Sequence, residues 1–105
     1  MSENTILIEN KGAVRILTLN RPEAGNSLNL QLSKEFYEAI LQCECDKNVK
    51  AVILTGKGKL FCGGGDLKFL LSDKSKIKKQ LLSMTNYLHG ALEIMAKMNA
   101  PVIVA

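Results

Sequence analysis

Three consecutive glycines follow a strand pattern and precede a helix pattern. Residues 51–55 form a short apolar, β-branched run typical of a buried strand, and residues 56–59 read as a turn. Residues 63–65 are all glycine, and residues 66–68 are the expected first turn of a helix. Glycine is unfavourable inside regular structure and adds no side chain to a core. The run therefore favours a close approach of backbone N–H groups to a ligand carbonyl or phosphate, at the positive end of the helix that follows.

The glycine run differs from the motifs that bind nucleotides. It is neither GxGxxG nor GxxxxGK[ST], because neither Lys-Ser nor Lys-Thr follows its last glycine. Two interpretations stay open on spacing alone. The run is either a ligand-binding loop or a plain flexible turn between a strand and a helix.

Length and composition exclude several classes of protein. At 105 residues and 47% hydrophobic, the chain suits one small domain or a piece of one. The net charge of +4 is mild, and 5% aromatic residues leave no stacking platform, so no nucleic-acid partner is expected. A basic nucleic-acid-binding or peptide-binding domain is the weakest alternative, which strong salt dependence of DNA binding would revive.

Cysteine content and the N-terminus indicate the compartment. Three cysteines and one histidine suit neither a disulfide framework nor a zinc centre, so no metal site is expected. The N-terminus lacks a signal-peptide pattern, and no apolar run approaches the ~20 residues that a membrane span needs. We therefore predict a cytoplasmic protein with no membrane partner.

The first half of the chain predicts a strand, strand, helix, strand order. Residues 5–9 and 13–19 read as a hairpin, because the residues between them tolerate positive φ. Apolar positions recur at helical spacing from residue 30 to about 45, with Asn29 or Ser27 as the N-cap. Asn26 is interpreted as turn chemistry. This order indicates an α/β layer.

The second half predicts two helices and a final strand. Residues 67–71 suggest a short helix, and an apolar stripe from Ile77 to Met98 suggests a long core helix. His89 lies beside that stripe and is expected to be partly buried, with no acid–base role. Residues 102–105 read as a buried strand. Because the chain stops inside this apolar run, we expect a truncation within a core strand.

Three segments together resemble the enoyl-CoA hydratase/isomerase family, the crotonases. Residues 19–29 are similar to its first signature, NRP followed after a short gap by N[AS]L, and residues 61–67 to its second, F-[CS]-[AS]-G-x-D-[IL]. Residues 100–105 are similar to the strand that precedes its third signature. The resemblance implies a crotonase-like spiral of strand-strand-helix units, of which residues 1–105 would be the N-terminal part of a single domain. It also implies a homotrimer or hexamer when full length.

The resemblance also implies roles for individual residues. Gly65 would supply one backbone N–H of an oxyanion hole and would be the catalytic residue of this chain. The substrate, an acyl-CoA thioester, would be bordered by the following backbone: Gly63, Gly64, Gly65, Asp66 and Leu67. Coenzyme A would be part of the substrate, with no separate cofactor. Gly63 departs from the family by replacing a small side chain, which suggests a looser loop.

The implied activity is hydration or isomerisation of an enoyl-CoA through an oxyanion-stabilised enolate. By the resemblance, the second oxyanion donor and the general acid–base carboxylates would follow residue 105. The full-length parent is therefore predicted to be an enzyme, and residues 1–105 alone are predicted to be inactive. The alternative is a non-catalytic module with a crotonase-like fold that binds acyl-CoA or another protein.

Overall fold

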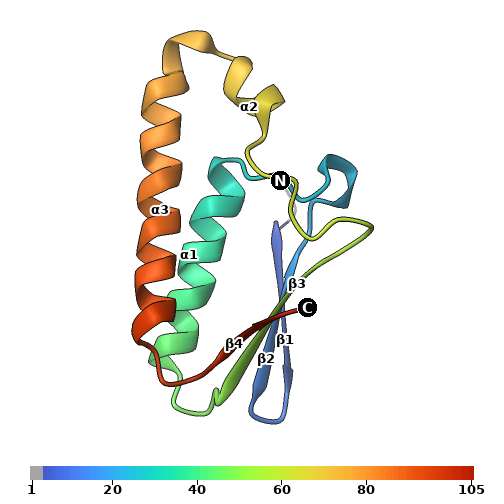
Figure 1. Ribbon diagram of the computed structural model, residues 1–105, viewed down its shortest axis with the longest axis vertical. Coiled ribbons are helices and arrows are strands. Elements are labelled where there is room, and N and C mark those ends of the chain that lie inside the picture. Colours follow the sequence, from blue (N-terminus) through green and yellow to red (C-terminus); the bar gives the residue numbers. More distant parts are fainter. Residues whose placement is uncertain (1–3) are drawn as a thin grey trace.

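The computed structural model describes residues 4–105 and contains two long helices beside one sheet (Figure 1). The strands are β1 (Ile6–Lys11), β2 (Val14–Leu19), β3 (Ala51–Gly56) and β4 (Val102–Val104). The helices are α1 (Leu30–Cys45), α2 (Leu67–Leu71) and α3 (Ile77–Lys97), with 3₁₀ turns η1 (Pro22–Ala24) and η2 (Lys74–Lys76). The predicted order of strands and helices is confirmed.

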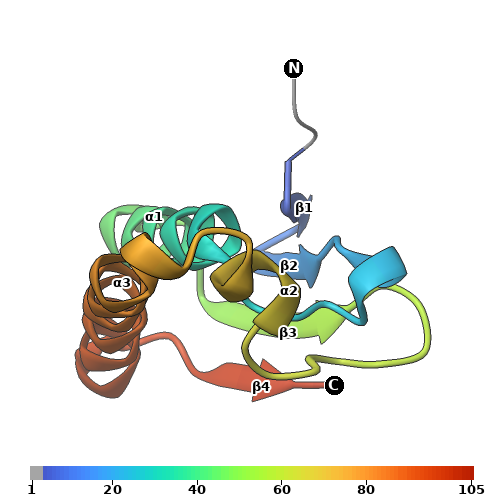
Figure 2. The same ribbon diagram turned by 90° about the horizontal axis from the view of Figure 1, so that it is seen from above.

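The sheet is mixed, with strands in the order β1-β2-β3-β4. β1 pairs with β2 antiparallel, whereas β2, β3 and β4 run parallel to one another. Figure 2 looks down on the molecule and shows α1 and α3 together on one side of the sheet. The chain therefore builds a two-layer α/β arrangement, as the sequence predicted.

Local signals set the boundaries of the first elements. Gly12 adopts a φ of +61° in the turn between β1 and β2, a conformation that glycine adopts without steric penalty. At the start of α1, the Asn29 side chain accepts a hydrogen bond from the N–H of Leu32, 2.8 Å away. The predicted hairpin and the predicted Asn29 cap are both confirmed.

The core lies between the sheet and α1. The inward side chains of the central strands are Leu17, Leu19, Val52 and Leu54, all buried. They meet the apolar face of α1, whose largest fully buried side chains are Leu32 and Ile40. α1 in turn packs against α3 at close range, since a Cβ on Gly90 would lie 2.8 Å from the Tyr37 ring.

The long helix is less buried than its apolar stripe predicted. Along α3 only Met84 and Ala91 are buried, while Leu81, Leu82 and Leu92 are exposed. The reason is that α3 packs on α1 along one flank, and residues 4–105 supply no element of comparable length for its other flank. His89 is exposed, so the expectation that it would be partly buried is wrong.

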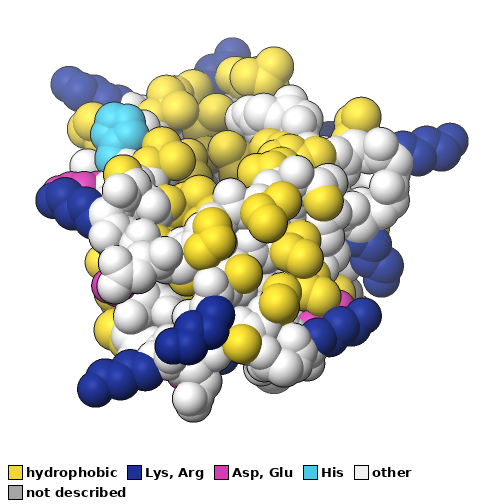
Figure 3. Space-filling view, turned by 60° about the horizontal axis from the view of Figure 1, so that its bottom comes forward, with side chains coloured by type: hydrophobic (Ala, Val, Ile, Leu, Met, Phe, Trp, Pro, Cys, Tyr) yellow, Lys and Arg dark blue, Asp and Glu magenta, His cyan; other side chains and the backbone are white. Residues whose placement is uncertain are grey.

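The surface carries much apolar side chain. In the view of Figure 3, hydrophobic side chains gather across the middle of the surface, with lysine and arginine side chains around the margin. Ile103 and Val104 on β4 are 54% and 60% exposed, so the expectation of a buried strand there is wrong: β4 lies at the edge of the described sheet and pairs only with β3. No helix within residues 4–105 is long and apolar enough to span a membrane.

Candidate functional site

Two loops leave the sheet side by side, at the carboxyl ends of parallel strands. Leu19 at the end of β2 lies in register with Gly56 at the end of β3. The Leu19 carbonyl oxygen also accepts a hydrogen bond of 2.9 Å from the N–H of Lys57. We call residues 20–29 the N-loop and residues 57–66 the glycine loop. This edge of a parallel sheet is where open α/β folds bind ligands.

A short parallel bridge joins the two loops and orients the glycine backbone. Leu28 donates its N–H to the Gly64 carbonyl oxygen at 2.6 Å, and its own carbonyl oxygen accepts from the N–H of Asp66 at 2.8 Å. Because the peptide between Gly64 and Gly65 is planar and trans, the Gly65 N–H points opposite to the Gly64 carbonyl. The Gly65 N–H therefore points away from Leu28, and no acceptor within residues 4–105 bonds it.

Each glycine of the run meets a different steric situation. Gly64 has a φ of +90°, which L side chains rarely adopt. A Cβ on Gly65 would meet nothing within 4 Å, so the side-chain position of Gly65 is open. A Cβ on Gly63 would lie 3.2 Å from the Gly25 carbonyl oxygen. This position is therefore tightly packed, which opposes the expectation that glycine loosens the loop there.

Asn26 is the most buried polar residue of the site. Its side chain is fully buried and bonds both loops: Nδ2 donates to the carbonyl oxygens of Lys57 at 2.9 Å and Leu60 at 2.7 Å. Its Oδ1 accepts from the N–H of Arg21 at 2.7 Å. The φ of Asn26 is +56°, in the left-handed region that asparagine tolerates better than most residues. The sequence alone assigns Asn26 only to the turn in which it lies. In the structure its side chain also holds the glycine loop through two hydrogen bonds.

Arg21 and Asp66 form an ion pair between the loops. Arg21 Nη2 lies 2.9 Å from Asp66 Oδ2, and both side chains are largely buried, at 15% and 12% exposure. Asp66 Oδ1 accepts from the N–H of Phe69 at 3.1 Å, so Asp66 is the N-cap of α2. Burial alone would raise the pKa of Asp66. Hydrogen bonds from Phe69 and Arg21, together with the Arg21 charge, outweigh burial and lower this pKa below its ordinary value.

Exposed apolar side chains lie on both sides of the three glycines in the sequence. Leu60 and Phe61 precede the three glycines, and Leu67 follows them with 69% of its surface exposed. The predicted site residues Gly63 to Leu67 therefore form one continuous segment, which combines an unbonded N–H with nearby apolar surface. Such a combination can receive a polar oxygen carried on an apolar chain.

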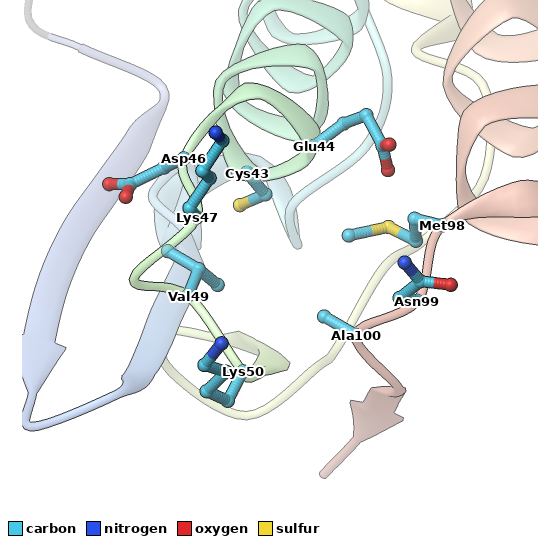
Figure 4. A pocket seen from close by; sticks show the side chains of 9 residues that line it. All are labelled: Cys43, Glu44, Asp46, Lys47, Val49, Lys50, Met98, Asn99 and Ala100. Carbon is cyan, nitrogen blue, oxygen red and sulfur yellow. The ribbon is translucent and has the colours of Figure 1, made fainter.

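One cavity, with a volume of about 390 Å³, lies away from the glycine loop. It is lined by the end of α1, by residues between α1 and β3, and by residues that follow α3, with Cys43 on its wall (Figure 4). β3 separates this cavity from the glycine loop, because one lies before the strand and the other after it. Burial raises the pKa of the Cys43 thiol, which opposes a nucleophilic role. Among residues 4–105, no three His, Cys, Asp or Glu side chains are grouped to hold a metal ion.

Sequence comparison decides the family. Residues 9–105 match the family described as enoyl-CoA hydratase/isomerase. The chain belongs to this family. The fold supports the assignment: a crystal structure of an enoyl-CoA hydratase from Mycobacterium smegmatis superposes with a TM-score of 0.85 and 31% identity, covering 97% of this chain and 39% of that one.

The similar proteins include one named as a hydrolase and one named as a hydratase/isomerase. The chain is 43% identical over 72 residues to 3-hydroxyisobutyryl-CoA hydrolase 1 of Arabidopsis thaliana, covering 69% of this chain and 19% of that protein. It is 31% identical over 107 residues to the putative enoyl-CoA hydratase/isomerase YngF of Bacillus subtilis, covering 100% of this chain and 40% of that protein. The chain thus spans less than half the length of these two relatives.

Proposed function

We propose that this chain contributes the acyl-CoA-binding and oxyanion-stabilising part of an enzyme that acts on CoA thioesters. Family membership supports the substrate class. The observation that carries the proposal is the Gly65 N–H, which points away from Leu28 and is not bonded by residues 4–105. Gly63 to Leu67 would border the bound thioester.

The proposed chemistry needs a fixed donor at the thioester oxygen. When water adds to an enoyl-CoA, or when a proton leaves its α-carbon, negative charge accumulates on this oxygen. A preorganised N–H about 2.7–3.1 Å away stabilises the charged species more than the ground state, and losing one such donor costs ~3 kcal/mol. Proton transfer in this proposal belongs to carboxylates outside residues 1–105.

A second candidate reaction is hydrolysis of the thioester. The 43% identity to the Arabidopsis hydrolase favours it, and the tetrahedral intermediate of hydrolysis also carries its charge on the thioester oxygen. The same Gly65 N–H would serve either reaction. We also propose that the full-length protein is a homotrimer or a hexamer and that it is located in the cytoplasm.

One assay separates these candidates. The protein expressed from its natural gene would be mixed with a 2-enoyl-CoA and, separately, with a 3-hydroxyacyl-CoA. Loss of the enoyl absorbance without thiol release would indicate hydration or isomerisation, whereas release of free CoA thiol would indicate hydrolysis. Binding without turnover would favour the non-catalytic module. Absence of binding to either thioester would contradict the proposal.

A further inference from the structure

The three consecutive glycines of the glycine loop have no side chains to hold them, so other residues must fix this segment. Residues 63–65 are all glycine, and glycine has more backbone freedom than any other residue. A donor N–H in such a segment keeps one direction only if its neighbours are fixed on both sides. The contacts that meet this need come from the N-loop.

Arg21 forms hydrogen bonds with the neighbours of both residues of the bridge between the loops. Its Nη1 donates to the Ser27 carbonyl oxygen at 2.5 Å, and Ser27 directly precedes Leu28. Its Nη2 donates to Asp66 Oδ2 at 2.9 Å, and Asp66 directly follows Gly65. A single planar guanidinium therefore ties together the residues next to Leu28 and Gly65, in a geometry that a lysine ammonium cannot reproduce.

The Asp66 carboxylate connects Arg21 to the first turn of α2. Its other oxygen accepts from the N–H of Phe69, so the start of α2, the end of the glycine loop and Arg21 are joined through one side chain. The N–H of Asp66 is also bonded, to the Leu28 carbonyl oxygen. Asp66, the residue that follows Gly65, is thus held at three points: its N–H and both oxygens of its carboxylate.

We infer that Arg21 is a positioning residue for the Gly65 N–H, acting through Ser27 and Asp66 and not by contact with substrate. The inference rests on the proposed function, because the proposed function is what makes the Gly65 N–H a donor to the substrate. Asp66 neutralises the charge of Arg21, so the side chain acts mainly through geometry. Misplacing a reacting group by about 1 Å can lower a rate by about 10²-fold.

The test uses three variants of the protein expressed from its natural gene. Arg21→Gln removes both contacts of the guanidinium. Asp66→Asn removes the charge partner but keeps an oxygen that can cap α2, since asparagine is a good N-cap. The control is Arg15→Gln, which breaks the ion pair of Arg15 Nη2 with Asp46 Oδ2, also 2.9 Å long, at the opposite end of β2.

Two measurements separate positioning from a general effect on folding. We expect Arg21→Gln and Asp66→Asn each to lower kcat about 10- to 100-fold, while the Kd for free coenzyme A, which has no acyl oxygen, changes less than about threefold. Combining the two substitutions should lower kcat little further, because both break one interaction. Arg15→Gln should reduce thermal stability and leave kcat unchanged.

A spectroscopic measurement keeps the inference separate from the proposed function. The ¹⁵N–¹H residual dipolar coupling of Gly65 reports the direction of its N–H whether or not the protein turns over a thioester. We expect this coupling to change in Arg21→Gln and Asp66→Asn but not in Arg15→Gln. An unchanged Gly65 coupling in Asp66→Asn, or a kcat equal to that of the unsubstituted protein, would overturn the inference. Loss of turnover in all three variants alike would overturn it too.

Discussion

The Phe61 carbonyl oxygen lies against Gly56, so closely that a Cβ on Gly56 would come within 2.6 Å of it. The same Cβ would lie 2.8 Å from the Phe61 α-carbon and 2.9 Å from Nδ2 of Asn26. Two of these three atoms are backbone and cannot rotate away. The end of β3 thus requires glycine, because the glycine loop folds back over it.

Gly56→Ala should therefore destabilise the protein and displace the glycine loop. Overpacking of this kind costs about 1–3 kcal/mol, measurable by urea unfolding. Gly12→Ala is the matched control: it places alanine at a positive φ, which costs about 1–2 kcal/mol, but the new methyl group meets nothing within 4 Å. Amide resonances of Gly64 and Gly65 should shift in Gly56→Ala and stay in place in Gly12→Ala. Equal stability of Gly56→Ala and the unsubstituted protein would contradict the packing argument.

Removing the Gly65 N–H should abolish most turnover. Gly65→Pro deletes this donor without breaking the bridge, because the bridge uses the N–H groups of Leu28 and Asp66. We expect kcat/KM to fall by about 10² or more. Gly65→Ala keeps the N–H and should retain clearly more turnover than Gly65→Pro.

Because proline also fixes φ, circular dichroism and the Kd for free coenzyme A should accompany the Gly65→Pro kinetics. Full activity in a folded Gly65→Pro protein would remove Gly65 from the mechanism. The glycine run would then be a flexible turn.

Acid should weaken the folded state partly through Asp66. Its pKa is lowered in the folded protein, so it stabilises the fold fully above its unfolded pKa of about 3.9 and loses this contribution as pH falls through the folded value. Urea unfolding between about pH 6 and pH 3 should show stability falling with acid. Asp66→Asn should flatten this slope, and an identical slope in Asp66→Asn would contradict the assignment.

The three thiols should react in an order set by exposure. Cys45 is exposed, Cys62 is partly buried, and Cys43 is buried with a raised pKa. Alkylation followed by mass spectrometry should modify Cys45 first and Cys43 only after unfolding. Rapid stoichiometric alkylation of Cys62 below neutral pH would instead indicate a reactive cysteine in the glycine loop.

The isolated 105-residue chain should associate through its apolar surface. Ile103 and Val104 are exposed on β4, which is an edge strand in the described sheet, and such edges pair with other chains. Light scattering should show self-association that Ile103→Lys reduces, whereas Thr85→Lys adds the same charge on α3 and should not. A monomeric chain with a cooperative melt above ~60 °C would contradict this expectation.

Local sequence signals predicted the elements of this fold well. Helical periodicity and the Asn29 cap placed α1 at residues 30–45, and the run before Gly56 indicated β3, because these signals act over a few residues. The segment from Gly63 to Leu67 was also identified from sequence, through an unusual glycine run and its family resemblance.

Only the tertiary structure determined how the glycine loop is held. Arg21 and Asp66 are 45 positions apart, and Asn26 lies 34 positions from Leu60. No local pattern links them, since they meet only because Leu19 and Gly56 end parallel strands in register. The exposure of α3 likewise depends on which neighbours it has. Periodicity identifies an apolar stripe, but burial requires a second surface, and that surface is a property of the fold.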